Sequence, residues 1–235
     1  SLLDFSILEE ADVASGLNLF TSRGCHNNCT FCTTVGKGEF YAKSFDDLRC
    51  LLEDYKKRLV DIFQDREIPT QAFKLSFNDD DFLGNPNRAV KFFKYIKGTP
   101  FYVNFIQTGI NSFFIRKGSH VTEKINMKLL DAMSENVFTP KKGKRDLDSP
   151  YVYLGTENFS DEELKRLGKG YDYKKIEMVI DELSRRRIVQ THHIILSNTE
   201  TTLDDIFDNL IKQARLRIKY GRCFSVLFPT ITNLV

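Results

Sequence analysis

The chain has 235 residues, which suits one α/β-barrel domain or two small domains, and at 41% hydrophobic it can bury a sizeable core. Its 34 basic and 32 acidic residues leave a formal net charge of +2, which argues against nucleic acid as the main partner. No segment reaches the roughly 18 consecutive apolar residues of a membrane span, and no signal peptide is visible. Three of the five cysteines lie too close together for a disulfide framework, which indicates a reducing, cytoplasmic setting.

Strand-like runs recur along the chain at roughly regular spacing, with helical patterns between them. Short apolar or alternating segments bounded by turn residues are typical of strands. The predicted strands are Leu17–Phe20, Ala72–Phe77, Phe101–Ile106, Tyr151–Leu154, Ile188–Leu196 and Phe224–Phe228.

The helices between these strands are predicted from their start signals and their apolar spacing. Ser or Thr followed three residues later by an acidic residue forms a capping box, and Pro is favoured at the first helical position. Gly168 is expected to end the short helix that follows Ser160. The predicted helix starts are Ser44 with Asp47, Asn85 with Pro86, Thr122, Ser160 with Glu163, and Thr201 or Thr202; a further helix carries Ile176, Val179, Ile180 and Leu183.

This alternation predicts parallel strands joined by right-handed helical crossovers. Six units of about 35 residues indicate a partial (β/α)6 TIM-type barrel, closed or nearly closed, although periodicity alone does not separate it from an open doubly wound sheet. In such barrels the working groups lie at the carboxyl ends of the strands.

We expect residues 1–235 to form a single domain that is a piece of a longer protein, because there is no initiator Met and the chain stops just after a strand-like run. A loop insertion, Thr139–Pro150, interrupts the pattern. Its basic run Lys141–Arg145 has the composition of a solvated loop, or of a contact with an anionic substrate or another domain.

Cys25, Cys29 and Cys32 form a C-x₃-C-x₂-C array directly after the first predicted strand. Three thiolates can hold one metal centre and leave a position open for chemistry. The alternatives are a structural zinc site with His26 as fourth ligand, or reactive thiols without metal. His26 adjoins Cys25, and neighbouring residues rarely point into one tetrahedral site, so we favour an iron–sulfur cluster.

This array, with Phe31 before its last cysteine, resembles the signature loop of the radical S-adenosylmethionine (SAM) enzymes. The resemblance implies a 4Fe–4S cluster on the three cysteines, with SAM bound through its amino and carboxylate groups to the open iron. It also implies reductive cleavage of SAM to a 5′-deoxyadenosyl radical and an external reductant such as flavodoxin or ferredoxin. Phe31 is expected to keep water off one side of the cluster.

Asp79, Asp80 and Asp81 follow the second predicted strand. A solvated acidic turn is the ordinary interpretation of such a run. The family resemblance implies instead that this segment binds the SAM ammonium, with Asp81 aligning best with the family's usual Glu. The Asp-Asp-x-Phe pattern resembles the branch of the family that carries an additional cobalamin domain, which would precede residue 1.

Glu157, after the fourth predicted strand, would by the same resemblance face the SAM ribose or amino-acid part. Lys169 or Arg166 would meet the SAM carboxylate, although cations also favour a helix end for structural reasons. Ser197 occupies the fifth-strand position near the adenine, where the family usually has Gly.

His192 and His193 are consecutive on a strand, so they point to opposite faces and we expect each to be structural. Cys50 and Cys223 are expected to be ordinary core or surface residues.

The sequence therefore predicts a radical SAM enzyme that abstracts hydrogen from an unactivated C–H bond, with cobalamin-dependent methylation or rearrangement as the favoured reaction. The runner-up is a methylthiotransferase acting on tRNA or a protein. A non-enzymatic electron carrier or zinc-stabilised module is the third alternative.

Overall fold

A computed structural model describes residues 4–34, 37–64, 67–68, 72–135, 151–226 and 230–231. Its centre is a parallel sheet whose strands pair in the order β1-β4-β5-β8-β9-β10, with β11 also pairing with β9. The bounds of these strands are β1 Leu17–Leu19, β4 Phe73–Phe77, β5 Phe101–Thr108, β8 Tyr151–Glu157, β9 Gln190–Ser197, β10 Phe224–Val226 and β11 Thr230–Ile231.

The strands follow one another in chain order, without the reversal that defines a doubly wound sheet. Among the described residues no pairing joins β1 to β10, so the sheet is an open, partial barrel. The prediction of a partial (β/α)6 barrel is confirmed, and full closure is wrong.

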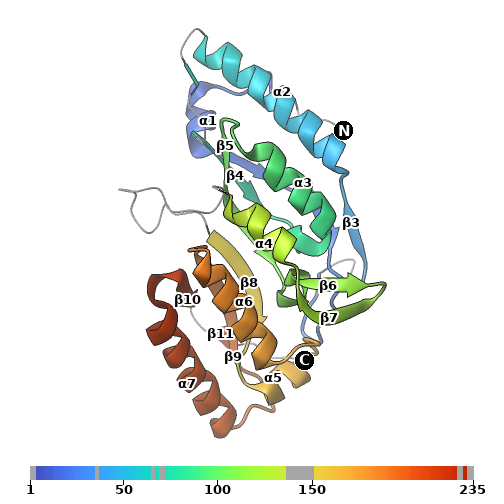
Figure 1. Cartoon of the computed structure of the whole chain (residues 1–235), viewed down its shortest axis with the longest axis vertical. Helices are drawn as coiled ribbons and strands as arrows, with labels where there is room; N and C mark the ends of the chain where they lie inside the picture. Colours follow the sequence, from blue (N-terminus) through green and yellow to red (C-terminus); the bar gives the residue numbers. More distant parts are fainter. Residues whose placement is uncertain are drawn as a thin grey trace.

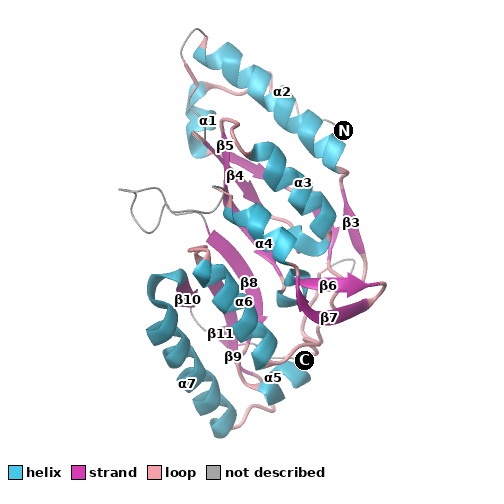
Figure 2. Cartoon of the chain, in the orientation of Figure 1, coloured by secondary structure: helices cyan, strands magenta, loops and turns pink. Residues whose placement is uncertain are grey.

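Helices cover one face of this sheet and succeed one another along it (Figure 1, Figure 2). None of the helices in the described ranges has the length and apolar character that a membrane crossing requires. The helices are α1 Glu10–Ser15, α2 Phe45–Phe63, α3 Pro86–Ile96, α4 Met127–Ser134, α5 Asp161–Arg166, α6 Tyr173–Arg185 and α7 Leu203–Tyr220, with short 3₁₀ turns η1 Phe82–Gly84, η2 Ile110–Phe113 and η4 Gly221–Cys223.

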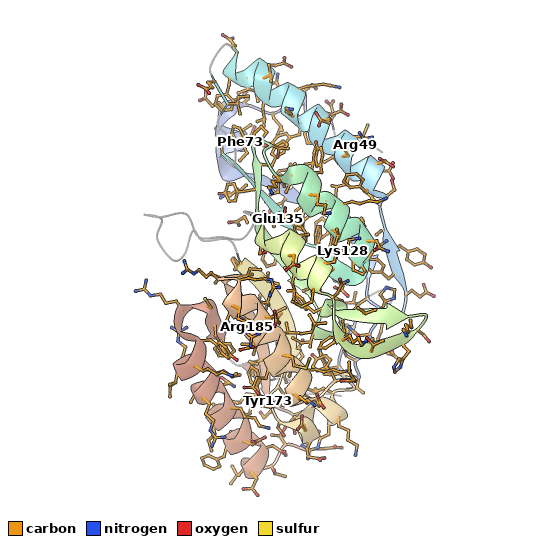
Figure 3. The ribbon with its side chains drawn as sticks, in the orientation of Figure 1. Arg49, Phe73, Lys128, Glu135, Tyr173 and Arg185 are labelled. Carbon is orange, nitrogen blue, oxygen red and sulfur yellow. The ribbon has the colours of Figure 1, made fainter. Side chains whose placement is uncertain are left out.

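The hydrophobic core lies between the sheet and these helices. Alternate strand residues such as Leu75, Val103 and Leu154 are fully buried on the helical side. Phe73 at the start of β4 packs against Phe63 at the end of α2, with ring centroids 5.5 Å apart (Figure 3). Apolar burial of this extent is the main stabilisation of the fold.

The opposite face of the sheet is half-exposed and mostly polar or aromatic; we call it the inner face. Because successive strand residues point to opposite sides, the inner face takes the positions between the core residues. Its side chains include Ser76 on β4, Asn104 and Gln107 on β5, Tyr151 and Tyr153 on β8, and Thr191 and His193 on β9.

Two separate antiparallel ribbons follow strands of the central sheet at its carboxyl edge. The first pairs β2 Ser22–Gly24 with β3 Phe40–Ala42 and closes the loop that carries the three cysteines. The second pairs β6 Phe114–Lys117 with β7 His120–Ile125. Neither ribbon was predicted.

Several helix starts are confirmed by their caps. Ser44 with Asp47 and Thr202 with Asp205 form complete capping boxes, and the Asn85 side chain accepts from the Arg88 N–H ahead of α3. Gly168 follows α5 with φ +66°, the left-handed conformation expected of a glycine at a helix end.

One predicted helix start is wrong. At a second, Ser160 is the N-cap residue as predicted, but its capping box does not form. Thr122 lies in β7, and α4 begins after Asn126, whose side chain accepts from the Leu129 N–H. Ser160 precedes α5 but makes no side-chain cap, because its Oγ donates to Asp205 instead. The expected loop 139–150, with its basic run 141–145, and residues 227–228 of the last predicted strand lie outside the described residues.

Candidate active site

The cysteine loop lies at the carboxyl edge of the sheet, where barrel enzymes place their working groups. Asn78, just after β4, donates its N–H to Leu19 O at the end of β1. The cysteine loop begins a few residues after Leu19. At the base of the loop, Gly38 N–H donates to Cys25 O at 2.9 Å. The sheet edge and the ribbon thus hold both ends of the loop.

The three thiols are free, with Cys29 buried and Cys25 and Cys32 partly exposed. Within the described ranges no three His, Cys, Asp or Glu side chains gather closely enough to ligate a single metal ion. A cubane cluster is a larger body than one ion and is bound by thiolates that stand further apart. The donor set of three free thiols in one loop therefore fits such a cluster.

Cys25 has a polar environment suited to a metal-bound sulfur. Its Sγ accepts from Asn27 N and Asn27 Nδ2, at 3.5 and 3.2 Å. Burial, together with the nearby Asp81 carboxylate, raises the pKa of the Cys25 thiol to about 11. The thiol is therefore protonated near neutral pH, and a metal would have to displace that proton on binding.

The loop docks against the end of α5 on its other side. Thr30 donates its N–H to Leu167 O at 3.1 Å and its Oγ1 to Arg166 O at 3.0 Å. A Cβ at Gly168 would stand 3.3 Å from Thr30 Cγ2, so a glycine permits this close approach. Residues 136 positions apart in sequence are thereby fixed side by side.

The three aspartates alternate in direction after β4. Asp79 is buried, accepts from Thr21 N and Oγ1 at 2.5 and 2.6 Å, and lies 3.5 Å from Arg88 Nη2. Asp81 is also buried and accepts from Thr108 and Ser112 at 2.5 and 2.7 Å. These two carboxylates are engaged with the protein itself.

Asp80 is the aspartate that borders open space. It is half-buried, accepts from Gly24 N at 2.8 Å, and lies beside Asn78 in a hollow of ≈ 210 Å³. The remaining lining residues of the hollow are Phe20, Ser22, Arg23 and Thr34. A carboxylate has about four acceptor positions, so Asp80 can accept further hydrogen bonds from a ligand.

Glu157 ends β8 in an unusual backbone conformation, with φ +68°. Its carboxylate is buried and lies between two cations or potential cations, 3.5 Å from Lys169 Nζ and 2.8 Å from His193 Nδ1. A non-glycine residue in the left-handed region is strained, so the surrounding contacts must hold it there.

Lys169 connects this carboxylate to the cysteine loop. Its Nζ lies 5.5 Å from the Phe31 ring centroid and 5.6 Å from the Tyr171 ring centroid. Burial alone would lower the pKa of Lys169, but Tyr171 and Glu157 outweigh it and hold the pKa above its ordinary value. The ammonium is therefore charged and flanked by two aromatic faces.

Arg166 does not join this group. Its guanidinium pairs with Glu163 and with Asp205, the latter at 2.8 Å, and so links α5 to α7. Ser197 lies at the carboxyl end of β9, on the strand next to β8, and is partly exposed. Lys169 and Arg166 were the two cations predicted to meet the SAM carboxylate. Of these, the structure places the Lys169 ammonium beside the cysteine loop.

Sequence reasoning missed two residues that contact Glu157 or the segment around Lys169. His193 was expected to be structural, yet it lies on the inner face against Glu157, whereas His192 is buried on the helical side and bonds Thr156 at 2.7 Å. Tyr171 donates its OH to Gly155 O at 2.9 Å, which ties Lys169 to β8. The two-residue alternation of the strand correctly placed the two histidines on opposite faces, but it did not show which of them meets Glu157.

Comparisons with known proteins support the fold. No protein-family model matches the sequence. No curated protein matches it either. Among solved structures, this chain resembles the cobalamin-dependent SAM radical enzyme OxsB with aqua-cobalamin and SAM bound, with a TM-score of 0.60 and 19% identity over 83% of this chain.

Two further structures have similar folds. One is the radical SAM methyltransferase TsrM from Kitasatospora setae with cobalamin and a [4Fe–4S] cluster bound (TM-score 0.58, 11% identity, 92% of this chain). The other is spore photoproduct lyase with bound SAM (TM-score 0.56, 11% identity, 94% of this chain). The chain spans 26%, 35% and 58% of the OxsB, TsrM and lyase chains, respectively. The structural neighbours are thus radical SAM enzymes, two of which bind cobalamin.

Proposed function

We propose that this chain is the core of a radical SAM enzyme. The observation that carries the proposal is the position of the C-x₃-C-x₂-C loop. It lies at the carboxyl edge of an open parallel barrel and docks against Lys169 through Phe31. The fold shared with three radical SAM enzymes supports the proposal.

Cys25, Cys29 and Cys32 would hold a 4Fe–4S cluster whose fourth iron is free to bind SAM. When bound, the cluster supplies the electron that cleaves SAM to methionine and a 5′-deoxyadenosyl radical, which abstracts hydrogen from an unactivated C–H bond. An external reductant such as flavodoxin or ferredoxin would provide that electron.

The chain's own residues would bind and orient SAM. Of the two cations, Lys169 is better placed for the SAM carboxylate, because its Nζ lies beside Phe31 and is held only loosely by Glu157, at 3.5 Å. Arg166 is paired with both Glu163 and Asp205. Asp80 and the carbonyls beside it would accept from the SAM ammonium, since the carboxylates of Asp79 and Asp81 are already engaged. Glu157 would lie at the ribose side, and Ser197 toward the adenine.

We further propose that the reaction is cobalamin-dependent, with a cobalamin-binding domain outside these residues. The Asp-Asp-x-Phe segment and the likeness to OxsB and TsrM support this branch.

The test is iron and sulfide content together with product analysis on anaerobically reconstituted protein. We expect about four irons and four sulfides per chain, and 5′-deoxyadenosine from SAM under dithionite. Cys29→Ala should lose both, whereas Cys223→Ala, in the 3₁₀ turn before β10, should keep both. Bound zinc without sulfide, or a cluster that never cleaves SAM, would contradict the proposal.

A further inference from the structure

Three ionisable side chains form a continuous row from the cysteine loop to the inner face. Lys169 Nζ lies 3.5 Å from Glu157 Oε1, and Glu157 Oε2 lies 2.8 Å from His193 Nδ1. Lys169 and Glu157 are buried, and the His193 side chain is 30% exposed. One carboxylate is therefore shared between two partners in a partly desolvated setting, where charges interact strongly.

The backbone holds the shared carboxylate in place. Glu157 adopts φ +68°, and the β8–β9 pairing shifts register between Leu154 and Glu157. A Cβ at Gly155 would stand 3.1 Å from Glu157 Oε1, so the absent side chain makes room for the carboxylate. Glu157 is thus fixed between its partners and has little freedom to follow either of them.

Lys169 is only partly committed to Glu157. Its 3.5 Å separation from Oε1 is longer than the 2.7–2.9 Å typical of a charge-assisted hydrogen bond. The flanking rings of Phe31 and Tyr171 stabilise the ammonium without neutralising it. A second carboxylate arriving beside the cysteine loop can therefore compete for Lys169.

His193 is the titratable end of the row. Its Nδ1 bonds Glu157, and no hydrogen bond to its Nε2 is found in the part of the chain that the structure describes. The hydrogen bond with Glu157 raises the pKa of His193, against the opposing effects of burial and of Lys169. Among the described residues, Tyr153 also faces His193, at a ring distance of 6.1 Å, and burial raises its pKa, so it stays neutral.

We propose that Lys169, Glu157 and His193 form a proton-linked relay, in which a carboxylate bound by Lys169 causes His193 to take up a proton. The proposal rests on the proposed function, which supplies that carboxylate as the amino-acid end of SAM. When Lys169 turns to the SAM carboxylate, Glu157 loses a compensating charge. His193 then takes one proton from solvent and becomes an imidazolium paired with Glu157.

The relay makes His193 a positioning residue with a defined consequence. SAM binding would be coupled to protonation on the inner face, where the substrate would lie. By linkage, the SAM affinity of wild-type protein relative to that of His193→Gln should fall as pH rises between the His193 pKa without SAM and its higher pKa with SAM, by at most about tenfold per pH unit.

The experiment is calorimetric titration of SAM into the reconstituted protein with its cluster oxidised, so that SAM binds without being cleaved. Repeating it in buffers of different ionisation enthalpy gives the protons taken up per SAM. Near the His193 pKa, wild-type protein should take up more protons per SAM than His193→Gln, whose amide can still donate to Glu157. The proton that the SAM ammonium gives up on binding iron is released equally in both proteins. His120→Gln, an exposed histidine of β7, is the matched control and should keep the uptake.

A second readout needs no cluster. In cluster-free protein, the NMR-measured pKa of His193 should fall in Glu157→Gln, because the carboxylate is lost. It should rise in Lys169→Met, because Glu157 is no longer shared. Unchanged values in both variants would overturn the coupling.

The outcomes separate this inference from the proposed function. If wild-type protein fails to bind SAM, the proposed function fails. If it binds SAM, and wild-type and His193→Gln proteins exchange the same number of protons per SAM, the relay alone is refuted.

Discussion

Replacing Asp79 should destabilise the protein far more than replacing its neighbour Asp80. Asp79 accepts two hydrogen bonds from Thr21 and pairs with Arg88, and both charged side chains are almost fully buried, at 0% and 3% exposure. Removing one partner of a buried pair leaves an uncompensated charge, at a cost of about 3–5 kcal/mol.

The magnitude should fall at the lower end of that range. Arg88 keeps hydrogen bonds to Thr21 O, Thr21 Oγ1 and Phe82 O, each at 3.0–3.1 Å, which partly compensate the orphaned guanidinium. We therefore expect Asp79→Ala to lower the free energy of unfolding by about 3 kcal/mol. Asp80→Ala should lower it by about 1 kcal/mol or less, because Asp80 is half-buried and accepts one backbone hydrogen bond.

The assay is urea unfolding of cluster-free protein, followed by far-UV circular dichroism. The double variant Asp79→Ala/Arg88→Met should be less destabilised than the sum of the single variants, by about 1–3 kcal/mol, because the two residues interact directly. Equal losses for Asp79→Ala and Asp80→Ala would refute the assignment of Asp79 to the framework and Asp80 to the open site.

Three further predictions concern the site and its support. Gly155→Ala should weaken SAM binding about tenfold, equivalent to 1.4 kcal/mol, since its Cβ would crowd the Glu157 carboxylate. Gly98→Ala lies in the turn between α3 and β5 and is strained by a φ of +79°, so it should lower stability but leave calorimetric SAM affinity unchanged. Lys169→Met should abolish SAM binding, whereas Arg166→Met should leave it intact and lower the urea midpoint; the reverse order would show that Arg166 holds the carboxylate. The pKa of buried His192 is lowered to about 3, so the unfolded chain binds a proton that the folded chain refuses, and stability should fall as pH drops from about 6.5 toward 3. The free energy of unfolding, measured at several pH values in this range, should depend less on pH in His192→Gln than in the wild type. An equally steep loss of stability in that variant would exclude His192 as the cause.

The sequence predicted the repeating architecture because each unit carries local signals. Ser44 and Thr202 form their capping boxes with residues three positions away, so no distant contact was needed to foresee them. Ser160 and Glu163 carry the same pattern, but tertiary partners prevail. Glu163 accepts from Asn198 Nδ2 at 2.6 Å and pairs with Arg166, so it cannot reach back to the cap.

In the candidate site, too, features encoded by neighbouring residues could be predicted and features set by distant contacts could not. The cysteine array is contiguous in sequence and could be predicted, whereas its support depends on contacts across more than 100 residues, such as Thr30 with Arg166. The directions of the three aspartates depend on hydrogen-bond partners 27 to 58 positions away in sequence, which the family resemblance did not convey. The β6–β7 ribbon was missed because Thr122 and Ile125 fit a helical spacing as well as a strand.

Electron paramagnetic resonance of the reconstituted, dithionite-reduced protein, with and without SAM, tests the central claim most directly. We predict a cubane signal from the wild-type protein that shifts when SAM is added, and no such shift in Lys169→Met. A cluster whose signal ignores SAM, or zinc in place of any cluster, would contradict the assignment of this chain as a radical SAM enzyme.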